Sequence, residues 1–144
     1  MQLSKKFKFC SIITASILLL VWFLNMYIGI RADEKTIVYM LNILKTPNSL
    51  KEPECESWGF TDILETCYIE ISPKEFPLLL KGYTYQESPQ FSNSHEVVRG
   101  QKLGPTFPVS KQYIAEPSEF KHGGFVSIYT NTEMNKAILD LYIE

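Results

Sequence analysis

The 144-residue sequence has few side chains of the kinds that carry out catalysis or bind metals. It contains two histidines, His95 and His122, and three cysteines. It lacks a P-loop, a dinucleotide-binding glycine fingerprint, an H-E-x-x-H motif and any internal repeat. No residue stands out as catalytic, and we expect a protein without enzymatic activity, cofactor or metal.

Two segments are weak candidates for catalysis. Residues 122–124 (HGG) resemble the oxyanion loop of some esterases, but the chain has no G-x-S-x-G elbow, and a glycine turn at the start of the hairpin explains them better. Ser92, Ser94 and His95 are neighbours in a polar segment, which says nothing about their geometry. A hydrolase that uses His95 or His122 is therefore only a remote alternative.

Charge is absent from a long stretch near the N-terminus. The 22 residues from Phe9 to Ile30 include no Asp, Glu, Lys or Arg, and a helix of this length reaches roughly 33 Å, enough to cross the ~30 Å hydrocarbon core of a bilayer. We predict a transmembrane signal-anchor. A cleaved signal peptide is the alternative, but its apolar region is shorter, and Ala32 at −1 with Ile30 at −3 matches an A-x-A site poorly.

Lysines indicate how this segment is oriented. Lys5, Lys6 and Lys8 precede it, whereas only Arg31 and Lys35 follow closely. The flank richer in Lys and Arg stays cytoplasmic. We therefore predict a cytoplasmic start at residues 1–8 and an exterior domain, which in a bacterium means the inner (plasma) membrane and the periplasm.

Basic residues are scarce in the rest of the chain. Residues 1–35 carry a net charge of +3 and residues 36–144 a net charge of −5. Nucleic-acid binding depends on Lys and Arg, so we expect no nucleic-acid partner. Three glutamates could hold Ca²⁺, but they lack the pattern of a known calcium loop, and a solvated acidic stretch is the simpler interpretation: Glu52, Glu54 and Glu56.

The residues after the anchor predict a juxtamembrane helix and linker over 31–54, then one α+β domain with antiparallel strands over 55–144. Apolar residues recur at helical spacing within Asp33–Lys45, where Asp33 can cap the first turn. The stripe consists of Ile37, Leu41 and Leu44. Thr46–Glu54 is polar, contains two prolines and reads as a loop.

The domain is expected to open with a strand over Asp62–Ser72 that is buried on one face and polar on the other. Ser72 and Glu75 have the spacing of a capping box, so a short helix should follow and end at Lys81-Gly82.

Later strands are expected at Glu96–Arg99, Pro108–Ala115 and in a C-terminal hairpin. The hairpin consists of Phe125–Thr130, a turn, and Lys136–Glu144. Since the sequence ends on this strand, we expect its last residues to belong to the fold.

Two of the cysteines, Cys55 and Cys67, lie in the exterior domain, while Cys10 lies in the apolar segment. Outside the cytosol such a pair usually oxidises, which would contribute roughly 3 kcal/mol. We predict a Cys55–Cys67 disulfide, with two buried free thiols as the alternative. Cys10 is interpreted as a small apolar residue, with reversible acylation as the alternative.

Aromatic residues are frequent, and most are expected in the core. The segment Gly82–Phe91 (GYTYQESPQF) combines aromatic and polar residues in a way that suits a recognition loop. Tyr83, Tyr85 and Phe91 are the candidate partner-binding residues, and an irregular loop is the alternative.

Three function classes follow from these features. The first is a membrane-anchored periplasmic binding protein with a protein partner. In build alone, it is similar to immunity proteins that neutralise toxins delivered to the periplasm. The second is a structural subunit of a bacterial envelope complex, and the third is the envelope hydrolase considered above.

Overall fold

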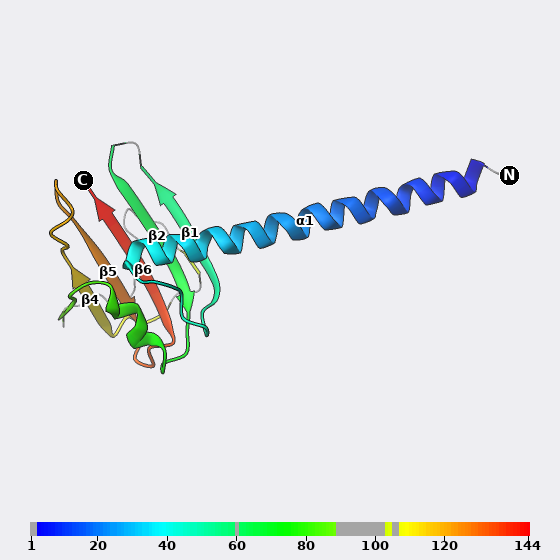
Figure 1. Ribbon diagram of the computed structural model, residues 1–144. Helices are drawn as coiled ribbons and strands as arrows, with labels where there is room; N and C mark the ends of the chain where they lie inside the picture. Colours follow the sequence, from blue (N-terminus) through cyan, green and yellow to red (C-terminus); the bar gives the residue numbers. More distant parts are fainter. Residues whose placement is uncertain (1–2, 60, 89–102, 105–106) are drawn as a thin grey trace. The chain divides into compact units, whose positions relative to one another are not determined.

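The computed structural model describes residues 3–59, 61–88, 103–104 and 107–144. The chain forms two compact units, Met1–Ala32 and Asp33–Glu144. Its elements, shown in Figure 1, are α1 (Leu3–Leu41), β1 (Lys51–Trp58), β2 (Ile63–Glu70), the 3-10 helix η1 (Phe76–Lys81), β3 (Gln86–Ser88), β4 (Lys111–Ala115), β5 (Gly124–Thr130) and β6 (Lys136–Ile143).

The first unit is the N-terminal part of α1. Its side chains from Ile17 to Leu24 are between 48% and 65% exposed. The helix carries apolar side chains on all of its sides. Over Thr14–Leu41, α1 is long and apolar enough to cross a membrane, which a signal sequence would be as well. A helix that is apolar all round needs lipid or protein around it.

The second unit is built on one six-stranded antiparallel sheet with the order β1-β2-β6-β5-β4-β3. The predicted C-terminal hairpin is confirmed as β5 and β6. Strand β6 lies between β2 and β5 and pairs with both along its whole length. The last strand of the sequence is therefore central in the sheet.

One face of the sheet, the α1 face, carries the main core. The last turns of α1 and the helix η1 lie over it (Figure 1). Their buried side chains pack on strand residues such as Ile69 and Leu139. The covering residues are Ile37, Met40 and Leu41 of α1 with Phe76 and Leu79 of η1.

The opposite face, which we call the Asp140 face, has a smaller cluster. Tyr68 and Ile138 pack there with Phe107, whose ring centroid is 6.4 Å from that of Tyr68. Gly104 has a φ of +59° and lies so close that a Cβ on it would be 2.3 Å from the Tyr68 ring. Gly104 and Phe107 therefore lie directly over this face of the sheet. The expected polar outer face of β2 is wrong, because Leu64, Thr66 and Tyr68 are buried.

The predicted helix after the anchor differs from the observed one in two ways. Asp33 is not an N-cap, because α1 runs without a break from Leu3 to Leu41. The helix also ends four residues early, since Asn42 takes a left-handed conformation with φ of 52° and the Ile43 N–H donates to the Val38 carbonyl. Leu44, predicted to lie on the apolar stripe, is fully exposed.

The predicted loop Thr46–Glu54 is shorter than expected, because β1 begins at Lys51. The register of β1 against β2 shifts between Lys51 and Glu54, and Pro53 lies at this shift in an edge strand. Proline is tolerated at such a position because it has no N–H to contribute to the ladder. Because of Pro53, the start of strand β1 was predicted as part of a loop.

The predicted capping box is also wrong. The structure has a short 3-10 helix, η1, with Glu75 as N-cap and no side-chain capping bond. The Glu75 carboxylate instead accepts hydrogen bonds from the backbone N–H and the hydroxyl of Ser49, both at 2.8 Å. The helix does end at Lys81, as expected.

Other strand predictions can be compared directly with the structure. The strands predicted at Asp62–Ser72 and Pro108–Ala115 are confirmed as β2 and β4, which are shorter than predicted. The short strand β3 was not predicted. The piece at Glu96–Arg99 lies outside the described residues.

Candidate functional site

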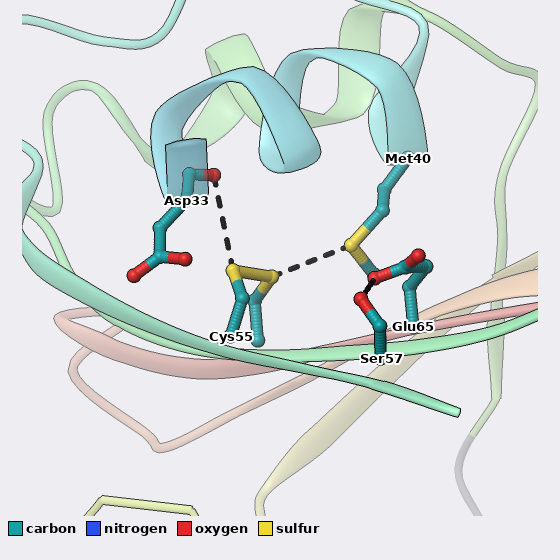
Figure 2. The surroundings of a disulfide bond; sticks show 6 residues. Asp33, Met40, Cys55, Ser57 and Glu65 are labelled. Carbon is teal, nitrogen blue, oxygen red and sulfur yellow. Dashed lines mark hydrogen bonds between the residues drawn. A yellow bond between two sulfur atoms is a disulfide. The ribbon is translucent and has the colours of Figure 1, made fainter. Parts of the chain in front are cut away.

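The two exterior cysteines form the predicted disulfide. Cys55 on β1 and Cys67 on β2 are direct register partners, with Cα atoms 4.1 Å apart and an S–S distance of 2.03 Å. Their sulfurs lie under the end of α1, where the Met40 sulfur is 3.4 Å from Cys67 Sγ and the Asp33 carbonyl oxygen is 3.8 Å from Cys55 Sγ (Figure 2). Sulfur in a disulfide has no proton, so these are packing contacts. The bridge ties the edge strand to the sheet beneath α1.

The candidate partner-binding tyrosines pack against the main core. The ring centroid of Tyr83 is 6.2 Å from that of Tyr85 and 6.3 Å from that of Phe120. The hydroxyl of Tyr85 is buried and has no hydrogen-bond partner among the described residues, and burial raises the pKa of this phenol. Phe91 lies outside the described residues. A binding role for Tyr83 and Tyr85 stays a prediction.

The weak catalytic candidates do not form a site in the described part of the chain. His122 is exposed and stands in a turn in which the Gly123 N–H donates to the Phe120 carbonyl. His95, Ser92 and Ser94 lie outside the described residues. Within those residues, no group of three or more His, Cys, Asp or Glu side chains is placed to hold a metal ion.

A groove of about 340 Å³ lies between the loop after α1 and η1. Its lining is largely apolar, from Ile43, Leu44, Pro47 and Leu78, and Leu44 is fully exposed. Lys45 and Lys81 also line it. Glu75 is the acidic residue of the lining, and its hydrogen bonds from Ser49 lower the pKa of its carboxyl group. The groove therefore combines an apolar lining with two lysines and one glutamate.

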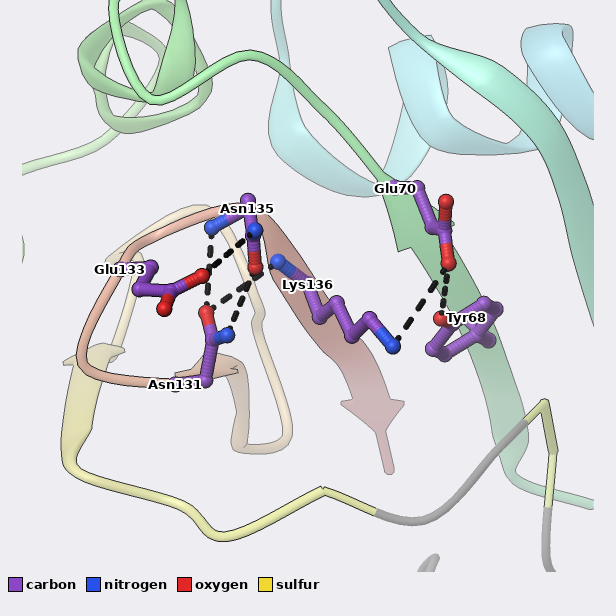
Figure 3. Close-up of polar contacts among 6 residues, drawn as sticks. All are labelled: Tyr68, Glu70, Asn131, Glu133, Asn135 and Lys136. Atoms are coloured by element: carbon purple, nitrogen blue, oxygen red, sulfur yellow. Dashed lines mark hydrogen bonds and ion pairs between the residues drawn. The ribbon is translucent and has the colours of Figure 1, made fainter.

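A second pocket, of about 310 Å³, opens where β2 and β6 meet the hairpin turn. Lys136 lies 3.9 Å from Glu70, which also accepts a hydrogen bond of 2.9 Å from the Tyr68 hydroxyl (Figure 3). The charged residues of the lining are Lys51, Lys136 and Glu70, so the pocket carries one net positive charge. Because Glu70 is paired with Lys136, Lys51 is the charge that this pocket leaves without an opposite one in its lining.

The turn beside this pocket is held by amide side chains. The Asn131 side-chain oxygen accepts a hydrogen bond from the Asn135 N–H at 3.0 Å, and Asn135 donates to Glu133 at 2.9 Å (Figure 3). These hydrogen bonds join residues of the turn to one another, which explains why the turn is rich in polar residues. They give the turn a structural role.

A buried polar row crosses the Asp140 face at the centre of the sheet, and sequence analysis missed it. Asp140 on β6 is the register partner of both Thr66 on β2 and Ser127 on β5. All three are buried, at 0%, 2% and 1% exposure respectively. Burial raises the pKa of Asp140 to about 7, and the nearby Thr66 hydroxyl offsets only part of this rise. The sequence feature that could have indicated this row is a single carboxyl group, Asp140, in the otherwise apolar middle of β6.

No protein-family model, curated protein or solved structure matches this chain. Its function therefore has to be inferred from its own residues.

Proposed function

We propose that this chain is a single-span protein of the inner (plasma) membrane whose C-terminal domain, Asp33–Glu144, lies outside the cytoplasm and binds a protein partner without catalysis. The single observation that carries the proposal is that a helix long and apolar enough to cross a membrane precedes a disulfide-bonded domain.

The helix supports the membrane anchor. The apolar side chains of Ile17 to Leu24 are about half exposed, at 48% or more, and exposing so much contiguous apolar surface to water is unfavourable at about 25 cal/mol per Å². A bilayer removes this surface from water. The lysines before the helix favour a cytoplasmic N-terminus.

The disulfide supports an exterior domain. Disulfides persist in oxidising compartments and are rare in the cytosol. Cys55 and Cys67 are register partners in the folded sheet, so folding itself brings their thiols together. The same orientation follows from the lysines, which is an independent argument.

The groove between the α1 loop and η1 supports protein binding. The domain is acidic overall, yet Lys45 and Lys81 line this groove beside the exposed Leu44. This arrangement suits a partner that inserts an apolar side chain flanked by Asp or Glu. An immunity-type role, in which that partner is a toxin acting outside the cytoplasm, is the version of this proposal that we would test first.

The test places a photo-crosslinking amino acid at position 44 of the full-length protein in cells, with position 132 as the control. Thr132 is also exposed but lies in the hairpin turn, away from the groove lining. We expect position 44, and not 132, to yield an adduct with a soluble exterior protein. The adduct should weaken several-fold with Lys45→Glu and Lys81→Glu together.

Other outcomes contradict the proposal in distinct ways. Adducts only with membrane proteins would favour a structural subunit of an envelope complex, and adducts only with itself would favour a homo-oligomer. Equal labelling from both positions would show that the groove is not the contact surface. For the immunity version, cells lacking the protein should become sensitive to a neighbouring or co-secreted toxin.

A further inference from the structure

Asp140 is the one Asp or Glu side chain that is fully buried within the part of the chain that the structure describes. It stands in the middle of β6, and β6 is enclosed by β2 and β5. Its neighbours across both ladders are hydroxyl residues, Thr66 and Ser127. A carboxyl group therefore occupies the centre of the sheet.

This carboxyl group is poorly compensated. Neither of its oxygens forms a hydrogen bond of normal length within the described residues, and the nearby Thr66 hydroxyl offsets only part of the effect of burial. An ionised carboxylate buried without a partner is strongly unfavourable, and such a group usually binds a proton instead.

The described groups that face Asp140 supply no cation close to it. Tyr129 on β5 is near enough for the Asp140 charge, after burial, to raise the pKa of its phenol. Lys136 lies at the start of β6 and is paired with Glu70. The other titratable residues that the register places on this face are Lys51, Glu54 and Glu56 on β1, Tyr68 on β2 and Tyr142 on β6, while β3, β4 and the described residues around Phe107 contribute none. Lys51 is the register partner of Glu70 and so lies at the same end of the sheet as Lys136.

We propose that Asp140 is a pH sensor built into the sheet: it is an uncharged carboxylic acid in the folded domain on the acid side of neutrality, and its deprotonation weakens the β2-β6-β5 ladders. The proton is exchanged with solvent, and no other group has to change its charge. The sensor needs no partner and does not depend on the proposed function.

The direction of the effect follows from linkage. Burial raises the pKa of Asp140 from 3.8 to about 7 in the folded chain, whereas the unfolded chain keeps a value near the ordinary one. Between these two values the folded state binds more protons, so raising the pH favours unfolding by up to about tenfold per pH unit. Stability is therefore highest at the acid end of this range and lowest at pH 7 and above.

The first test observes Asp140 itself in the full-length protein in detergent micelles. The chain has only three aspartates, Asp33, Asp62 and Asp140, so ¹³C-carboxyl aspartate labelling gives three signals. Asp33→Asn and Asp62→Asn assign the other two without altering the sheet centre. We expect the Asp140 signal to titrate near pH 7, and a midpoint near pH 4 would overturn the proposal.

The second test measures thermal unfolding of the same protein by near-ultraviolet circular dichroism between pH 5 and pH 7. The folding equilibrium constant of the wild type should fall by about 50-fold relative to that of Asp140→Asn across this range. Asp62→Asn, the matched control at a partly exposed site, should run parallel to the wild type. If Asp140→Asn instead runs parallel to the wild type, the proposal is wrong. If that variant does not fold, the titration of the wild-type carboxyl group decides.

Discussion

At the scale of single residues, two tyrosine hydroxyls show that the same atom can stabilise or destabilise a fold. The Tyr68 hydroxyl donates a 2.9 Å hydrogen bond to Glu70, whereas the buried Tyr85 hydroxyl has no partner among the described residues. A buried polar group without a partner costs about 1–3 kcal/mol, and a satisfied hydrogen bond contributes about 1 kcal/mol.

We therefore predict opposite effects from one substitution type. Tyr85→Phe should raise the free energy of unfolding by about 1 kcal/mol, because it removes an unpaired hydroxyl, and Tyr68→Phe should lower it by a similar amount. Thermal denaturation of the two variants beside the wild type checks this. Destabilisation by Tyr85→Phe would show that its hydroxyl has a partner, such as a bound water.

At the scale of elements, the disulfide connects the edge strand β1 to β2, which is its only partner in the sheet. β1 pairs with β2 alone, its register shifts near Lys51, and Pro53 lies at this shift. The bridge removes conformational freedom mainly from the unfolded chain. The edge strand should therefore depend on it more than the central strands do.

Replacing Cys55 and Cys67 together with Ala should lower the free energy of unfolding by about 3 kcal/mol. Cys10→Ala, which changes the cysteine outside this domain, is the matched control and should leave the melting temperature unchanged. Hydrogen exchange should show the largest loss of protection in β1. Equal loss across all strands would mean that the bridge supports the whole sheet.

The position of β6 explains why the end of the chain matters. It pairs with β2 and β5 along its full length, so deleting residues 140–144 removes half of the central strand. We expect this deletion to abolish the cooperative unfolding transition. Deleting Glu144 alone, which is exposed and donates one 3.2 Å hydrogen bond to the Gly123 carbonyl, should change the melting temperature only slightly. An unchanged melting curve for the longer deletion would refute this role of β6.

The elements also show which parts of the fold a pattern can reveal. The hairpin of β5 and β6 was predictable because its apolar residues alternate and a polar turn separates its strands. β1 was not, because its pairing is set by β2 and its register shifts around Pro53, which no local pattern shows. The end of α1 depends in the same way on a left-handed Asn42, so Leu44 was wrongly assigned to the apolar stripe of this helix. Buried Asp140 was missed because nothing local shows that the outer face of the sheet is covered.

At the scale of the whole molecule, one experiment tests whether the apolar helix stays attached to the domain and holds it at the membrane. If the helix is a retained anchor, the chain should stay with membranes after alkaline extraction and keep the full mass of its 144 residues. A shortened, extractable chain would identify a cleaved signal peptide instead. The domain would then be exported but not tethered.

The disulfide can report on orientation in the same cells. In the wild type, Cys55 and Cys67 should be oxidised, so that an alkylating reagent modifies Cys10 alone under denaturing, non-reducing conditions. Replacing Lys5, Lys6 and Lys8 with Ser removes the cytoplasmic bias, so a fraction of the chains should insert in the opposite orientation.

In the inverted chains the domain faces the reducing cytosol, so all three cysteines should react. Arg31→Ser with Lys35→Ser is the matched control, because it removes positive charge from the other flank and should leave the domain fully oxidised. If the lysine variant is oxidised as completely as this control, the lysines do not set the orientation. Reduced cysteines in the wild type itself would instead place the domain in the cytosol, and the proposal of an exterior binding protein would fail with it.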